Sequence, residues 1–269
     1  MRLSNARMTL KFASNLSFMF TECPSIIGRY QLAKDAGFQA VESGFPFGYS
    51  VQQVTQAKEA AQVDQVLINV FTGDVAKGEL GFAAIPGKEE EFRKSIQLTI
   101  DYAKALKCSK IHVMAGIVEN PSPVNDTVYE SNLRYAVDKF AKEDIVGLIE
   151  PINGYSVPNY YMNCYDKGLA LVKKINSPHL KLMFDIFHLQ HIKGNITNVI
   201  KENFQHLGHV QVAQVPDRHE PDTPGELDYR YILSVLEKLG YTGHIGLEYK
   251  PKTKSVEGLK WIHNFGYSL

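Results

Sequence analysis

Residues 146–187 read VGLIEPINGYSVPNYYMNCYDKGLALVKKINSPHLKLMFDIF and contain the pattern that decides the fold. They begin with the apolar run Val146–Ile152, continue with the helical stretch Asp166–Ile175, and end with the apolar run Leu180–Phe187. Short, nearly continuous apolar runs are typical of parallel strands that are covered on both faces. The stretch therefore predicts a strand, a crossover helix and a second strand that runs parallel to the first.

The same alternation continues from one end of the chain to the other. The eight predicted strands are Lys11–Ser17, Ala40–Phe45, Gln65–Phe71, Lys110–Gly116, Val146–Ile152, Leu180–Phe187, His209–Pro216 and His244–Pro251. The clearest helical patterns between and after them are Glu89–Leu106, Asp126–Ala141, Asp166–Ile175, Tyr229–Leu239 and Val256–Phe265. Gly37 and Gly240 end two helical stretches, and we expect both to be helix C-caps.

Eight strands that alternate with helices, with no linker between them, predict a fold of class α/β: a single (β/α)8 barrel of residues 1–269. Such a barrel takes about 250 residues, nearly the whole chain. A doubly wound open sheet is the alternative, but it usually has fewer strands and a glycine-rich turn after the first strand. Here the first strand runs into NLSFMFTE (15–22), which contains no glycine.

Composition excludes several classes of partner and compartment. The chain has a formal net charge of zero and 22% charged residues, so no basic field favours nucleic acid or an anionic membrane. Its three cysteines are widely spaced and predict no disulfide framework. Residues 1–16 have no apolar run long enough for a signal peptide, and no segment approaches the ~20 apolar residues of a membrane span. We expect a cytoplasmic protein.

Four polar residues lie at the carboxyl ends of the last four predicted strands, where packing alone would not place them. Glu150, Asp185, Gln211 and Glu248 come from neighbouring strands, so their side chains can converge at the mouth of the barrel. Three carboxylates would repel one another unless a cation lay between them. An oxygen-rich set without thiolate or imidazole favours Mg²⁺ or Mn²⁺ over Zn²⁺. The alternative is a separate ion pair with Lys or Arg for each acid.

The histidines are predicted to differ in role. His188 follows Asp185 by three residues and is a candidate to bind a substrate hydroxyl or carbonyl group. His191 lies further into the next helix and is expected to be structural. His112 and His244 lie near the starts of their strands, and we expect both to be distant from the mouth.

Two loops carry further candidates. The loop after the seventh strand reads PDRHEPDTPGELDY (216–229), in which prolines stiffen the backbone. Arg218 offers a planar fork that suits a substrate carboxylate, and Glu220 is a second substrate-binding candidate. The loop of residues 72–87 contains four glycines and is a candidate lid. Lys77 and Glu79 lie at its rim, and Lys77 is a further substrate-binding candidate.

The sequence resembles the hydroxypyruvate isomerase family, within the xylose isomerase-like barrels. The resemblance spans nearly the whole chain. It is carried by IEPIN (149–153), FDIFH (184–188), GHVQVAQVPDRHEP (208–221), PGELDY (224–229) and GLEYKP (246–251), and also by FASNLSFMFTE (12–22), GDVAKGELGFAAIPG (73–87), YAKALKCSKIHVMAG (102–116) and VEGLKWI (256–262).

The resemblance implies a barrel enzyme that interconverts hydroxypyruvate and 2-hydroxy-3-oxopropanoate. In that family the glutamates that match Glu150 and Glu248 donate and accept the proton, and the metal ligands map to Glu150, Asp185, Gln211 and Glu248. Related ketose epimerases have histidine where Gln211 stands. The resemblance also implies a small anionic hydroxy-carbonyl substrate, and barrels of this type often form homodimers.

Three rival functions remain open from the sequence. The nearest is a 2-oxo-tetronate isomerase or a ketose 3-epimerase on the same scaffold. A nuclease of the xylose isomerase-like group would need many histidines at strand ends and a basic face, which this chain lacks. A non-catalytic barrel would not need the four strand-end polar residues.

Overall fold

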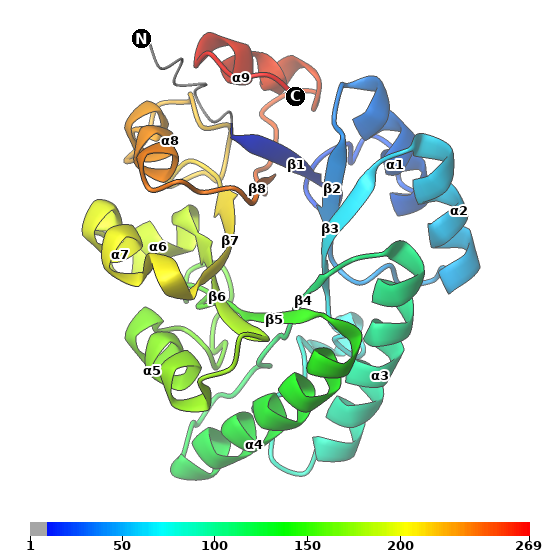
Figure 1. The fold of residues 1–269 in the computed structure, drawn as a ribbon, viewed down its shortest axis with the longest axis vertical. Helices are drawn as coiled ribbons and strands as arrows, with labels where there is room; N and C mark the ends of the chain where they lie inside the picture. The colour runs from blue at the N-terminus through cyan, green and yellow to red at the C-terminus, as the bar shows by residue number, and fades with distance from the viewer. Residues whose placement is uncertain (1–9) are drawn as a thin grey trace, which may run out of the picture.

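The eight short apolar runs form a closed barrel of parallel strands in the order β1 to β8, in a computed structural model that describes residues 10–269 (Figure 1). The strands are β1 (Lys11–Asn15), β2 (Ala40–Ser43), β3 (Asp64–Asn69), β4 (Lys110–His112), β5 (Val146–Ile149), β6 (Leu180–Asp185), β7 (Leu207–Val212) and β8 (His244–Leu247). Most of residues 1–16, on which the expected lack of a signal peptide rests, lies outside the described residues. The (β/α)8 prediction is confirmed.

The helices surround the barrel as an outer ring. They are α1 (Ile26–Asp35), α2 (Val51–Ala61), α3 (Glu89–Leu106), α4 (Pro123–Phe140), α5 (Tyr165–Ile175), α6 (Ile186–Ile192), α7 (Ile196–Asn203), α8 (Tyr229–Lys238) and α9 (Lys260–Asn264). The short 3₁₀ turns are η1 (Val75–Lys77), η2 (Ala141–Glu143), η3 (Phe204–His206) and η4 (Glu257–Leu259). Figure 1 shows α9 between α8 and α1, where it closes the ring.

The strands begin within two residues of their predicted starts but end two to four residues earlier than predicted. An example is β4, after which residues 113–115 no longer belong to the strand but remain buried. The apolar pattern indicates which residues are buried, and some buried residues lie beyond the end of the paired strand.

Local signals explain most helix ends. Gly37 and Gly240 have φ of 104° and 74° and directly follow the C-cap residues of α1 and α8, so both predicted caps are confirmed. Helix α4 begins three residues before its predicted start, because Pro123 occupies its first position and Asn125 Oδ1 accepts the Ser122 N–H at 2.9 Å. The predicted helix Val256–Phe265 is divided into η4 and α9.

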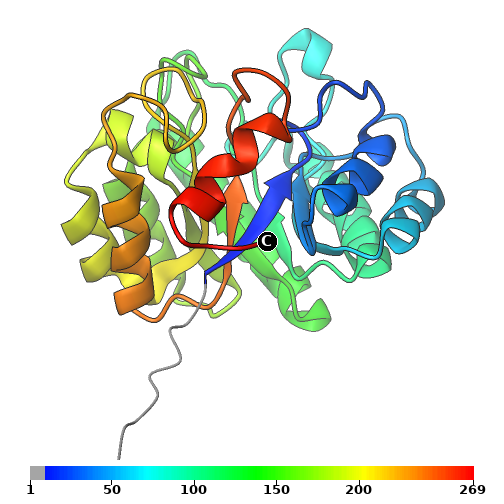
Figure 2. The same ribbon diagram turned by 90° about the horizontal axis from the view of Figure 1, so that it is seen from above.

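The candidate lid of residues 72–87 has two halves. Residues 74–78 are exposed, and Figure 2 shows η1 rising at the end of the barrel toward which the β1 arrow points. Residues 81–84 are buried, and α4 holds them because Asn125 and Asn132 donate to the carbonyls of Ala84 and Ala83 at 2.9 Å each. Within this loop, only residues 74–80 therefore remain candidates for a lid.

All three cysteines are free, as the sequence predicted. Among residues 10–269, no helix has the length and apolar character needed to cross a bilayer.

Candidate active site

Four polar side chains meet at the carboxyl ends of the last four strands. Glu150 directly follows β5, Asp185 closes β6, Gln211 lies near the end of β7, and Glu248 directly follows β8. Asp185 and Gln211 are paired in the β6–β7 register, so their side chains share the inner face of the barrel. Glu150, Asp185 and Gln211 are buried, and the Glu248 side chain is 15% exposed. We call Glu150, Asp185 and Glu248 the acid cluster.

Arg218 is the cation beside the acid cluster. Its Nη2 lies 2.5 Å from Glu248 Oε2 and 3.2 Å from Asp185 Oδ2, and its guanidinium lies between the rings of Phe18 and Phe187, 4.6 and 4.8 Å from their centroids. The residue has φ of 59°, a left-handed conformation that non-glycine residues adopt at an energetic cost. The β7–α8 loop therefore holds Arg218 in a strained conformation that directs its charge at the acid cluster.

The charges of this cluster do not balance. Three carboxylates face one guanidinium, which leaves a deficit of two positive charges if all three are ionised. Burial, and then the neighbouring Glu248, raise the pKa of Glu150 well above its usual value. Burial raises the pKa of Glu248 to about 8, although Arg218 opposes the shift, and burial also raises the pKa of Asp185. Protons or a divalent cation can supply the missing charge.

Two buried oxygen atoms of the predicted ligand set lack hydrogen-bond partners among residues 10–269. These atoms are Glu150 Oε1 and Gln211 Oε1. A buried oxygen without a partner costs about 1–3 kcal/mol. A hard divalent cation would satisfy both atoms and the unbalanced carboxylates together, so the residues present fit the predicted oxygen-ligand set.

His188 is a second candidate ligand, since Glu150, Asp185 and His188 each have a ligand atom within 4.8 Å of the others. Its Nδ1, however, lies 3.2 Å from the Asn153 backbone N–H, which can only donate. Burial lowers the pKa of His188 well below its usual value, so the neutral ring carries its proton on Nε2. That proton faces Asp185 Oδ2 at 3.5 Å and Glu150 Oε1 at 3.9 Å. The geometry favours a hydrogen-bond donor over a metal ligand.

Comparison with known proteins identifies the family. Residues 30–265 match the family model described as the xylose isomerase-like TIM barrel. The chain belongs to this family. The resemblance to hydroxypyruvate isomerases is also confirmed, because a Drosophila melanogaster protein named "Putative hydroxypyruvate isomerase" is 42% identical over 97% of this chain and 100% of its own.

Bacterial relatives agree on the class of enzyme. The hydroxypyruvate isomerase of Escherichia coli strain K12 is 38% identical over 94% of this chain and 98% of its own length. The 2-oxo-tetronate isomerase of Cupriavidus necator is 38% identical over 94% of this chain and 97% of its own length.

 These relatives are all named as isomerases, and this member of the xylose isomerase-like family is an isomerase.

A solved structure of the same family is also close in sequence. The crystal structure from Brucella melitensis named "AP endonuclease, family 2" is 41% identical, covers 95% of this chain and 98% of its own, and has a TM-score of 0.91. Solved ketose epimerases, such as the D-allulose 3-epimerase of Methylomonas sp., superpose with a TM-score of 0.74 at 17% identity, which shows the shared fold alone.

Sequence reasoning missed a buried acid on the other side of the barrel. Glu42 in β2 is fully buried, and its carboxylate accepts hydrogen bonds from His209 Nε2 at 2.6 Å, Gln211 Nε2 at 2.7 Å and Asn15 Nδ2 at 2.9 Å. Asn15 also donates to Glu248 Oε1 at 3.1 Å. Glu42 follows the same rule as the predicted ligands, an acid near the end of an apolar strand, so the signal was present.

The prediction that His112 lies far from the mouth is wrong. Strand β4 has only three residues and His112 is its last, so the side chain lies near the carboxyl ends of the strands. Its Nε2 lies 3.6 Å from Glu150 Oε2, and burial lowers the pKa of His112 to about 3. His244 is the first residue of β8, at the amino end of that strand.

Two predicted substrate-binding residues do not join the acid cluster. Glu220 is buried, and its carboxylate accepts the Lys252 N–H at 3.1 Å and 3.3 Å, which connects the loops that follow β7 and β8. Glu220 thereby holds these loops together, and its contact with substrate stays a prediction. Lys77 forms an ion pair with Asp74 at 3.1 Å, and its side chain is 79% exposed.

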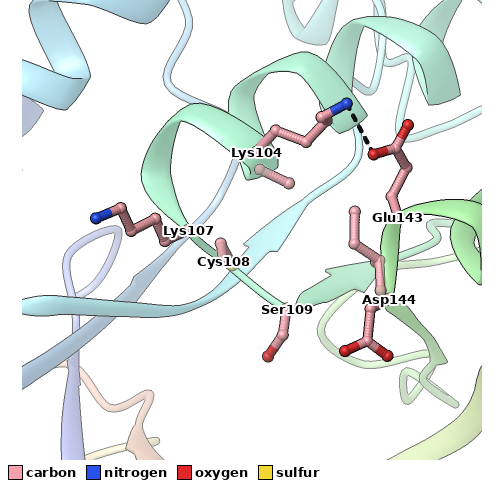
Figure 3. Close-up of a pocket in the computed structure, with 8 residues that line it drawn as sticks. Lys104, Lys107, Cys108, Ser109, Glu143 and Asp144 are labelled. Atoms are coloured by element: carbon pink, nitrogen blue, oxygen red, sulfur yellow. Dashed lines mark ion pairs between the residues drawn. The ribbon is translucent and has the colours of Figure 1, made fainter.

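A cavity of about 330 Å³ lies at the opposite end of the barrel (Figure 3). It lies where α3 ends and where β4 and β5 begin, and the ion pair between Lys104 and Glu143 spans 2.7 Å at its edge. None of the predicted site residues lines it. Barrel enzymes place their chemistry at the carboxyl ends of the strands, so this cavity has no part in the candidate active site.

Proposed function

We propose that this isomerase interconverts hydroxypyruvate and 2-hydroxy-3-oxopropanoate with the help of Mg²⁺ or Mn²⁺. The observation that carries the proposal is the acid cluster of Glu150, Asp185 and Glu248, with the unpartnered oxygen atoms of Glu150 and Gln211 beside it. The relatives named as hydroxypyruvate isomerases support the choice of substrate.

Glu150, Asp185, Gln211 and Glu248 would hold the cation. When bound, a divalent cation supplies a Lewis acid that stabilises negative charge on the substrate oxygens. The side chains come from four neighbouring strands, so the barrel backbone fixes their spacing before any ligand arrives.

Glu150 and Glu248 would move the proton. In hydroxypyruvate, the carbonyl carbon lies between a hydroxymethyl carbon and a carboxylate. One glutamate accepts a proton from the hydroxymethyl carbon, which gives an enediolate, and the other returns a proton to the former carbonyl carbon. The proton of the hydroxymethyl oxygen moves to the former carbonyl oxygen, so that the product is an aldehyde with a neighbouring hydroxyl group. The charge of Glu248 contributes to the raised pKa of Glu150, so the two carboxyl groups are close enough to act on one substrate.

Arg218 and His188 would orient the substrate. Arg218 uses Nε and Nη2 on Glu248 and Asp185, and Nη1 makes no hydrogen bond within residues 10–269. That amino group is available for the substrate carboxylate. His188 offers its Nε2 proton to a substrate oxygen near the reacting carbons, because Asn153 occupies Nδ1.

A 2-oxo-tetronate is the second candidate substrate, since the Cupriavidus necator relative is named for it. It shares the carboxylate and carbonyl groups that Arg218 and the cation would bind. A nuclease, the function in the name of the Brucella melitensis structure, is disfavoured because the strand-end set is acidic and the chain has no net positive charge.

Proton NMR tests the proposal directly. The purified protein is incubated with hydroxypyruvate and Mn²⁺ or Mg²⁺, before and after a chelator is added. We expect the aldehyde product, in free or hydrated form, to accumulate with metal and to stop accumulating with chelator. The same assay with a 2-oxo-tetronate and a neutral ketose ranks the candidate substrates. Turnover of none of the three would refute the proposal.

A further inference from the structure

We propose that Glu42 is a positioning residue that fixes the side-chain amide of Gln211, so that the amide oxygen faces the acid cluster. The inference rests on the proposed function, because it concerns how Gln211 becomes a metal ligand. It assigns a role to a buried acid that the predicted ligand set does not include.

The carboxylate of Glu42 is held as an acceptor. Gln211 Nε2 and Asn15 Nδ2 donate to its Oε1 at 2.7 and 2.9 Å. His209 Nε2 lies 2.6 Å from its Oε2. Oε1 is therefore the acceptor for two amide N–H groups, and these contacts hold the carboxyl group in place inside the barrel.

The acceptor determines which way the Gln211 amide points. Gln211 Nε2 donates to Glu42 Oε1 at 2.7 Å. If the amide were turned over, its oxygen would face the carboxylate oxygen at this distance, and two acceptors would repel each other. The other end of the amide is therefore the oxygen, and it is the atom that is buried without a partner among residues 10–269.

The backbone makes room for this arrangement. Gly246 in β8 is the register partner of Gln211, and a Cβ at Gly246 would lie 2.2 Å from Glu42 Oε1. Only a glycine at this position lets a side chain from β2 reach across to β7. Because Gly246 has no side chain, the long side chain of Glu42 can reach Gln211.

The test measures metal affinity rather than activity. Free Mn²⁺ is titrated by electron paramagnetic resonance into the metal-free protein, with the wild type measured first. In Glu42→Gln, one end of the new amide donates, so a turned Gln211 is no longer excluded. Residues that orient metal ligands typically contribute 10- to 100-fold in affinity, and we expect the dissociation constant for Mn²⁺ to rise at least tenfold.

Two further variants separate positioning from stability. Glu42→Asp keeps the charge but withdraws the carboxylate from Gln211, and we expect it to weaken Mn²⁺ binding as well if Glu42→Gln fails to fold. The control is Tyr30→Phe, which removes a buried hydrogen bond of 2.7 Å to Gln65 and leaves Gln211 untouched. We expect this control to lose stability but to keep wild-type affinity.

The outcomes distinguish the inference from the proposed function. Wild-type affinity in a folded Glu42→Gln or Glu42→Asp variant would overturn the inference and leave the metal centre intact. Equal weakening in Tyr30→Phe would also overturn it, because the effect would then be general. A wild-type protein that binds no Mn²⁺ would refute the proposed metal centre itself.

Discussion

At the scale of single residues, Glu150 and Glu248 carry the proposed proton transfer. Glu150→Gln and Glu248→Gln each keep the shape of the side chain and remove the titratable group. We expect each variant to lower kcat by on the order of 10²- to 10⁴-fold at saturating Mn²⁺, which is the usual contribution of a general acid or base. Near-normal turnover by either variant with metal bound would contradict its assignment.

Arg218 is predicted to recognise the substrate carboxylate. Lysine at this position keeps the charge but cannot form the planar fork, and hydrogen bonds to charged groups contribute about 1.5–3 kcal/mol each. We expect Arg218→Lys to raise KM for hydroxypyruvate by roughly 10- to 100-fold. A neutral ketose, if it is turned over, serves as the control substrate and should be affected less. Equal effects on both substrates would show that Arg218 does not bind the carboxylate.

The strand-end rule predicted most of the candidate site, and its failures have a physical cause. It identified Glu150, Asp185, Gln211 and Glu248 because each lies at or near the end of an apolar run that the sequence shows directly. It gave no sign that Asn15 bridges Glu42 and Glu248, because that contact forms only when β1 pairs with both β2 and β8. Contacts that depend on closure of the barrel cannot be read from local pattern.

At the scale of elements, the loop between β3 and α3 is divided into a fixed and an exposed half. Gly81 has φ of 99°, and a Cβ there would lie 2.2 Å from the Met114 carbonyl oxygen. Gly78 has φ of 80° but no atom within 4 Å of such a Cβ. Both glycines therefore have a left-handed backbone conformation, but only Gly81 is packed closely against other atoms.

We expect Gly81→Ala to lower the free energy of unfolding by more than Gly78→Ala does. The left-handed backbone alone costs a non-glycine residue about 1–2 kcal/mol, and Gly81→Ala adds a steric clash with backbone. Chemical denaturation of both variants measures the difference. Equal losses would mean that the loop does not pack tightly on Met114.

The boundaries of elements were predicted less well than their order. Helix Glu89–Leu106 was predicted with both ends correct, because its apolar spacing is regular over 18 residues. The strand ends were placed too late, since residues such as Val113 and Val215 are buried without belonging to a strand. The apolar pattern cannot distinguish a residue that is buried within a strand from one that is buried in the loop after it.

At the scale of the whole molecule, the acid cluster makes the free energy of unfolding depend on pH and on bound metal. A carboxyl group whose pKa is raised in the folded state binds more protons when folded than when unfolded. Stability then falls as pH rises, from the unfolded pKa near 4.5 up to the folded pKa, which is about 8 for Glu248. The buried histidines act in the opposite direction, because their lowered pKa values make stability rise with pH, but most of this gain is complete by pH 7.

We therefore expect the free energy of unfolding of the metal-free protein to fall between pH 7 and 8, by on the order of 1 kcal/mol for each proton that the acid cluster retains. Urea denaturation at both pH values measures this, with Glu248→Gln as the control that removes one titrating group. Saturating Mn²⁺ should restore the stability at pH 8. A metal-free protein that became more stable over this interval would contradict the raised pKa values.

Anomalous X-ray diffraction at the manganese edge, from crystals grown with Mn²⁺, tests the proposed metal centre most directly. We expect one peak, within about 2.0–2.6 Å of oxygen atoms from Glu150, Asp185, Gln211 and Glu248. No peak at the carboxyl ends of the strands, or a peak held by His188 Nε2 without Gln211, would contradict the four-oxygen centre.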